Sequence, residues 1–158
     1  MAPRRVIAGF DPSPTGGNAL WWAVSRAVQL NAILFVVVHR QERLFTVPRP
    51  PALVSSLPQE QLHIDVLDAL LLTVGELPAD LDVRVAPVTG RVLTAIGHLA
   101  DRPTDVVVLA KPPHRWRPRH SVEVFVAVDP ITPPTRMSRR AAQRGPLSVY
   151  NGWDAGRE

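Results

Sequence analysis

Four short hydrophobic runs are separated by longer segments in which hydrophobic residues recur at helical spacing. The first two runs are compact and uninterrupted, as expected for strands buried on both faces of a parallel sheet. The third run alternates, which is typical of a less buried strand, and the fourth is rich in valine. The predicted strands are Val6–Phe10, 32–38, 81–88 and 105–110. One predicted helix follows the first strand, and the others span residues 59–77 and 91–100.

The turn after the first strand contains residues that end a strand and start a helix. Asp11 is followed by two prolines and by Gly16-Gly17, which interrupt regular backbone structure. Thr15 or Asn18 can cap the helix that follows. A strand, a tight turn and a helix form the first half of a βαβ unit. Repetition of this unit predicts an α/β fold with a doubly wound, mainly parallel sheet, whose ligand crevice lies at the carboxyl ends of the strands.

The segment 122–130 is ambiguous between a strand and a helix. Valine at every second position from Val122 to Val128 favours a strand, although residues 111–120 are few for a parallel crossover. This strand pairs either at the edge of the sheet or with another subunit. The residues that follow show little hydrophobic periodicity. We therefore expect an α/β domain over residues 1–130 and a basic, largely irregular tail over residues 131–158.

Composition indicates a folded domain with an uneven distribution of charge. Hydrophobic residues make up 46% of the chain and charged residues 20%, which excludes a globally disordered protein. Residues 111–158 carry nine basic and four acidic residues, so the formal charge of +4 arises in the last third of the chain. There is no cysteine, which excludes disulfides and thiolate metal sites. With no recognisable signal peptide or transmembrane run, we expect a cytoplasmic protein.

Three stretches resemble a known family. From Asp11 to Ala23 the chain reads DPSPTGGNALWWA, where the family pattern is D-G-S-x-x-S-x-x-A-L-x-W-A. VTGRVLTAI (88–96) is similar to the start of the family's third helix, and TDVVVLA (104–110) to its fourth strand. Over residues 4–110 the chain thus resembles the universal stress protein family. The resemblance implies a three-layer fold with strand order 3-2-1-4, to which the segment near 122–128 adds an edge strand.

The resemblance also implies an adenine-nucleotide site at the carboxyl edge of the sheet. Family members bind the nucleotide against the ends of the first two strands and in a glycine-rich loop after the fourth. Asp11 would then lie beside the nucleotide or its magnesium ion. The expected ligand is ATP or another adenine nucleotide, with magnesium only as its companion. Carried over, the nucleotide-binding residues are Gly9, Phe10, Asp11, Val38, Ala110, Lys111, Ser121 and Val122.

The phosphate loop itself departs from the family pattern. Ala110, Pro113 and His120 stand where the family has glycines, and a proline has no backbone amide to offer a phosphate. Basic side chains surround Trp116 in this loop instead. The loop is either an anion site in which the tryptophan stacks on a base, or a solvated basic loop whose tryptophan packs against the sheet.

These features predict a stress-response regulatory protein with a degraded adenine-nucleotide site, not an enzyme. The alternative is an interaction protein or structural homodimer of the same fold that binds no nucleotide. Residues 122–128 would leave an apolar strand edge, so we also expect a homodimer in which this segment pairs with, or packs on, its counterpart. Nucleic acids and membranes are not expected partners, and no catalytic or metal-ligating residues are predicted.

Overall fold

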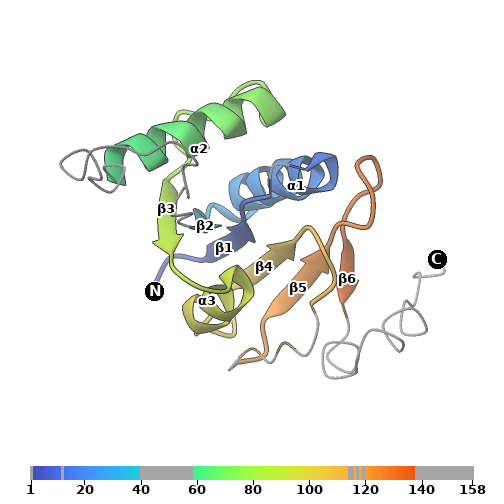
Figure 1. The fold of residues 1–158 in the computed structure, drawn as a ribbon. Helices are drawn as coiled ribbons and strands as arrows, with labels where there is room; N and C mark the ends of the chain where they lie inside the picture. Colours follow the sequence, from blue (N-terminus) through green and yellow to red (C-terminus); the bar gives the residue numbers. More distant parts are fainter. Residues whose placement is uncertain are drawn as a thin grey trace, which may run out of the picture.

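The computed structural model describes residues 2–11, 13–39, 59–113, 116, 118 and 120–137. Within these residues, strands and helices alternate as far as the fourth strand (Figure 1). The strands are β1 (Arg5–Gly9), β2 (Ile33–His39), β3 (Val83–Val88), β4 (Val106–Leu109), β5 (Glu123–Val126) and β6 (Thr135–Met137). The helices are α1 (Pro14–Leu30), α2 (Gln59–Val74) and α3 (Val92–Leu99).

The strands form one sheet in the order β3-β2-β1-β4-β5-β6. All neighbours are parallel except β5 and β6, which are antiparallel. Val6 of β1 pairs with Leu34 of β2 on one side and with Val106 of β4 on the other. The predicted order 3-2-1-4 is therefore confirmed, and the additional strand near 122–128 is β5.

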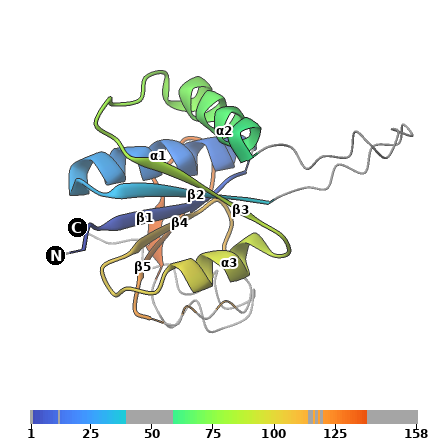
Figure 2. The ribbon, with the colours of Figure 1, turned by 90° about the vertical axis from the view of Figure 1, so that its left-hand side faces the viewer.

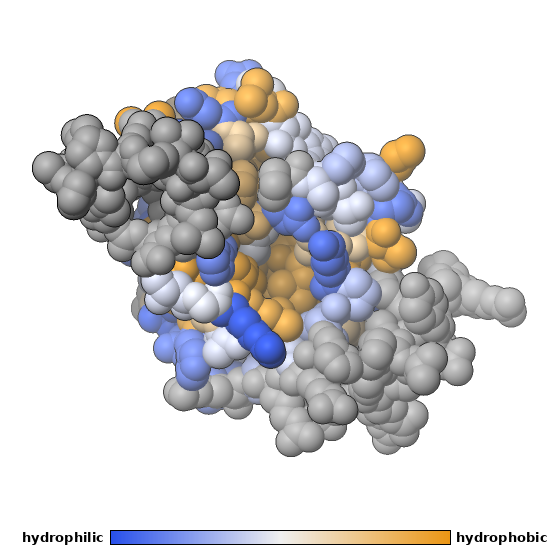
Figure 3. All heavy atoms as spheres, viewed as in Figure 1, coloured by the Kyte–Doolittle hydropathy of each residue, from blue (hydrophilic) through white to orange (hydrophobic). Residues whose placement is uncertain are grey.

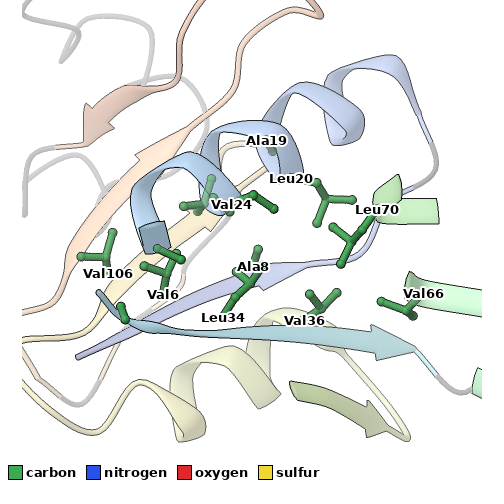
Figure 4. Close-up of a cluster of buried hydrophobic side chains, with 14 of the residues drawn as sticks. Val6, Ala8, Ala19, Leu20, Val24, Leu34, Val36, Val66, Leu70 and Val106 are labelled. Carbon is green, nitrogen blue, oxygen red and sulfur yellow. The ribbon is translucent and has the colours of Figure 1, made fainter. Parts of the chain in front are cut away.

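Helices on both faces of the sheet give the predicted three layers (Figure 2). α1 and α2 lie on one face and α3 lies on the other. Between the first two helices and the sheet, Leu20 and Val24 of α1 and Leu70 of α2 pack over the central strands (Figure 4). A fully buried leucine of this kind contributes about 1.5–3 kcal/mol to stability. The hydrophobic pattern of the strands thus reflects burial on both sides.

α1 begins earlier than the sequence predicts. Ser13 is its N-cap, and its Oγ accepts a hydrogen bond from the amide of Gly16 at 3.0 Å. The proline at the next position suits the first turn of a helix, because that turn needs no intrahelical amide donor. The predicted caps Thr15 and Asn18 are therefore inside the helix.

A cluster of charged residues lies at the amino ends of β1 and β4. Arg5 donates from Nε to Oδ1 of Asp105 at 3.0 Å and from Nη2 to Oδ2 at 2.5 Å. The same guanidinium binds Asp101, and the amide of Arg102 donates to Asp105 at 3.0 Å. Arg5 is 8% exposed and Asp105 is fully buried, and the hydrogen bonds to Asp105 raise the pKa of Arg5. The cluster therefore joins two central strands through a buried ion pair.

In the described part of the chain, the connection from β4 to β5 contains no helix. Trp116 occupies the α3 face instead, with 5% of its surface exposed, among side chains of β1, β4 and β5. Its Nε1 lies 2.9 Å from the position that a Cβ would take at Gly97, so this glycine lets α3 approach the indole closely. Packing of Trp116 against the sheet is therefore confirmed. Base stacking by this residue is wrong, because a buried indole offers no free face.

The segment after β5 folds back onto the sheet. The Asn18 amide of α1 donates to the carbonyl oxygens of Asp129 at 2.9 Å and Thr132 at 2.7 Å, which ties this loop to the helix. β6 then pairs with β5, with Val124 opposite Met137. Residues 135–137 of the predicted irregular tail are thus a strand, and residues 138–158 lie outside the described residues.

The predicted homodimer was to pair through the free edge of β5. In the structure β5 has a neighbour on each side, β4 and β6, so this edge is already occupied within the chain. The prediction overlooked β6 because TRM (135–137) carries no alternating hydrophobic pattern. Edge-to-edge pairing of two copies through β5 is therefore wrong, whereas a homodimer in which this segment packs on its counterpart stays a prediction.

Removing residues 131–158 should increase self-association beyond that of the intact chain. The truncation uncovers the edge of β5, and an exposed apolar edge pairs readily with another chain. Light scattering on both forms at equal concentration measures this difference. If the truncated and intact chains had the same mass in solution, β6 would not be what protects β5.

Candidate functional site

The carboxyl ends of β1 and β4 meet where the strand order reverses, which is the usual ligand crevice of an open α/β sheet. Figure 3 shows a hollow on this side of the molecule, with a hydrophobic floor and hydrophilic residues at its border. Asp11 lies two residues beyond β1, and Lys111 lies two residues beyond β4. A carboxylate and an ammonium group are thereby placed at the same crevice.

Asp11 is held by the turn that starts α1. Its Oδ1 accepts a hydrogen bond from the amide of Ser13 at 2.9 Å. This bond lowers the pKa of Asp11, and the Ser13 hydroxyl and the positive charge of Lys111 lower it further. The half-buried carboxylate is therefore ionised at neutral pH. Its remaining lone pairs can accept from a ligand hydroxyl or coordinate a cation.

The same turn requires a glycine at position 16. A Cβ on Gly16 would lie 2.1 Å from the carbonyl oxygen of Asp11 and 2.6 Å from its Cβ. The nearer atom belongs to the backbone, so the clash can be relieved only by moving the turn. Sequence reasoning missed this role, since the only signal was that Gly16 departs from the serine of the family pattern.

Most other predicted site residues at this edge also pack in the hydrophobic core. Val38 is 6% exposed, and its side chain lies in the cluster beneath α1 and α2, which Phe10 and Ala110 also contact. A Cβ on Gly9 would meet the Val92 side chain of α3 at 3.3 Å. The predicted residues that the fold brings together at the carboxyl edge are Gly9, Phe10, Asp11, Val38, Ala110 and Lys111.

Ser121 and Val122 lie at the opposite edge of the sheet. They immediately precede β5, which runs parallel to β4, and Glu123 pairs with Val106 at the start of β4. Ser121 is exposed, while Val122 packs in the cluster on the α3 face. The structure therefore separates them from Asp11 and Lys111, and their part in nucleotide binding stays a prediction. The connection returns to the amino edge before them, whereas the family pattern places them at the start of a helix.

The two residues directly after Lys111 offer a phosphate no backbone amide. Pro112 and Pro113 have no amide hydrogen, and Pro113 is buried. The other basic residues that the sequence places here, His114, Arg115, Arg117 and Arg119, lie outside the described residues. Lys111 is exposed and is the one described cation that follows β4 at this edge.

The described residues contain neither a metal-binding cluster nor a membrane-spanning helix. No three histidine, aspartate or glutamate side chains among them lie close enough to hold a metal ion. None of their helices is both long and apolar enough to cross a membrane.

No protein-family model and no curated protein sequence matches this chain. The fold does match solved structures. One is a universal stress protein in complex with cAMP, with 19% sequence identity and a TM-score of 0.52 over 80% of this chain and 97% of the other. Another is the universal stress protein UspA from Lactobacillus plantarum, with 18% identity and a TM-score of 0.49 over 80% and 99% of the two chains. The cAMP-bound structure and the strand order together show that this chain has the fold of the universal stress proteins.

Proposed function

We propose that this chain is a stress-response regulator of the universal stress type, which binds an adenine nucleotide weakly and catalyses no reaction. The observation that carries the proposal is the placement of Asp11 and Lys111 at the reversal point of the sheet. The sequence pattern from Asp11 to Ala23 and the fold of a cAMP-bound neighbour support it. Asp11 and Lys111 suit a regulatory role in which the protein responds to a bound ligand and does not catalyse a reaction.

Each of the two charged groups has a different part in this proposal. The ammonium of Lys111 would bind a phosphate, and the ionised Asp11 would accept from a ribose hydroxyl or hold a magnesium ion. Asp11 repels a phosphate that approaches without a cation. With prolines at positions 112 and 113, backbone amides do not surround the phosphates as in a glycine-rich loop. A single phosphate therefore suits the site better than three.

Isothermal titration with AMP, cAMP and ATP, each with and without magnesium, tests this proposal. We expect the monophosphates to bind at least as tightly as ATP, and ATP to have a Kd above about 1 µM. Lys111→Gln should weaken AMP binding roughly tenfold, since a hydrogen bond to a charged group contributes about 1.5–3 kcal/mol. Arg102→Gln is the matched control, because Arg102 lies near the amino edge, where its amide binds Asp105.

Two outcomes would contradict the proposal. Submicromolar binding of ATP would mean that side chains of the loop have replaced the missing amides. Absence of binding by all three nucleotides would leave the second candidate, an interaction protein of the same fold without a nucleotide. That candidate is favoured by the loss of glycines at positions 110, 113 and 120.

A further inference from the structure

A cavity lies on the α3 face of the sheet, between α3 and the strands β2 and β3. Its volume is about 760 Å³, which is within the range of small-molecule sites. It exists because α3 has only eight residues and packs on β1 and β2, while α2 covers β3 from the opposite face. The α3 face of the edge strand β3 is left open beside the helix.

The floor of this cavity is apolar. It is formed by Val37 of β2, which is fully buried, and by Ala86 and Val88 of β3, which remain partly exposed. Ala95 and Leu99 of α3 form part of the wall. A ligand body that covers these groups would remove apolar surface from water, which contributes roughly 25 cal/mol per Å².

Polar groups gather at the rim and carry only positive or neutral charge. Thr94 and His98 lie one helical turn apart on α3, and Thr89 and Arg91 precede the helix. None of these four side chains has a hydrogen-bond or ion-pair partner among the described residues, and none of the described lining residues is acidic. Arg91 is exposed, and no carboxylate of the described residues pairs with its guanidinium.

We propose that this cavity binds a small organic anion: one anionic group on a compact apolar body. The apolar body lies on the floor made by β2 and β3, and the anionic group accepts hydrogen bonds from Arg91 and the rim hydroxyls. Two observations independent of each other point to this chemistry: the apolar floor, and a cation at the rim that has no ion-pair partner in the described part of the chain. The site is separate from Asp11 and Lys111, neither of which lines the cavity.

Naphthalene-1-acetate and its neutral analogue naphthalene-1-acetamide are suitable probes, because they share one apolar body and differ in charge. Titration followed by amide NMR spectra of the intact chain gives both affinity and location. We expect the acid to bind at least about tenfold more tightly than the amide, with shifts concentrated in residues 89–91 and 94–99. Equal affinity for the two probes, or no binding of the acid at millimolar concentration, would overturn the proposal.

Variants separate the roles of charge and shape. Arg91→Gln should remove most of the acid's advantage and leave amide binding unchanged, whereas Arg4→Gln, at the amino end of β1, should change neither. Ala95→Phe fills the cavity and should abolish binding of both probes, provided that its spectrum remains that of a folded chain. Unchanged acid binding in Arg91→Gln would refute the site even if the Ala95 variant fails to fold. Asp11→Asn should leave the binding of both probes unchanged, because Asp11 does not line this cavity. The outcome of the nucleotide titration therefore does not decide whether the cavity binds an organic anion.

Discussion

Replacing Asp105 with alanine should destabilise the protein by roughly 3–5 kcal/mol, the largest effect that we expect from a single charged residue here. The variant leaves the guanidinium of Arg5 buried between β1 and β4 without its main partner, and it removes the acceptor of the Arg102 amide. Asp101 would still pair with Arg5, but its side chain is 57% exposed, so most of the desolvation cost of the buried guanidinium would be left uncompensated. Chemical denaturation with urea measures the loss directly.

Asp82→Ala is the control for this prediction. Asp82 also forms an ion pair, with Arg84 at 2.9 Å, but both side chains are about half exposed. Exposed pairs contribute about 0–1 kcal/mol, so this variant should remain close to the parent in stability. If the two variants lost similar amounts of unfolding free energy, burial would not explain the contribution of the Arg5–Asp105 pair to stability.

Gly16→Ala should disrupt the turn that positions Asp11 and destabilise the protein by about 3 kcal/mol, at the upper end for overpacked sites. Its new Cβ would lie 2.1 Å from the carbonyl oxygen of Asp11, so the end of β1 and the start of α1 have to separate. The hydrogen bond from the Ser13 amide to Asp11 would be lost with that movement. Thermal unfolding and nucleotide titration should therefore both show a deficit.

Gly17→Ala provides a control at the next position. A Cβ there meets only the Thr73 methyl group, at 3.6 Å, which is ordinary contact. Alanine inside a helix is favoured over glycine by roughly 0.5–1 kcal/mol, so this variant should be as stable as the parent or more stable. A destabilised Gly17→Ala together with an unaffected Gly16→Ala would contradict the geometry described for the turn.

The central sheet could be predicted from the sequence because its signals are local and strong. Apart from Gly9, Val6–Phe10 and residues 32–38 are hydrophobic throughout, because helices cover both faces of these strands. β6 could not be predicted in this way. Its position depends on Asn18, which binds a carbonyl 111 residues further along the chain, and no local pattern encodes that contact.

The candidate site likewise has parts that follow from local sequence and parts that depend on distant contacts. Asp11 was predicted correctly at the carboxyl edge because the turn around it is formed by its immediate neighbours, Ser13 and Gly16. The position of Ser121 and Val122 could not be predicted in this way, because it depends on the path of the connection after β4, where this chain has no described helix. The cavity at α3 had no sequence signal, since a short helix beside an edge strand leaves a cavity only once both are folded.

The Arg5–Asp105 pair has a consequence for how the chain folds as it is synthesised. Its two members are 100 residues apart in the sequence. In the sheet, β1 lies between β2, which is synthesised soon after it, and β4, which is synthesised only after α3. At about 5–20 residues per second, a ribosome needs several seconds to reach β4 after releasing β1. Throughout that interval one side of the first strand lacks its neighbour, and Arg5 remains hydrated. The central sheet and the Arg5–Asp105 ion pair are therefore both completed when β4 is added. A nascent chain that ends before β4 lacks part of the core.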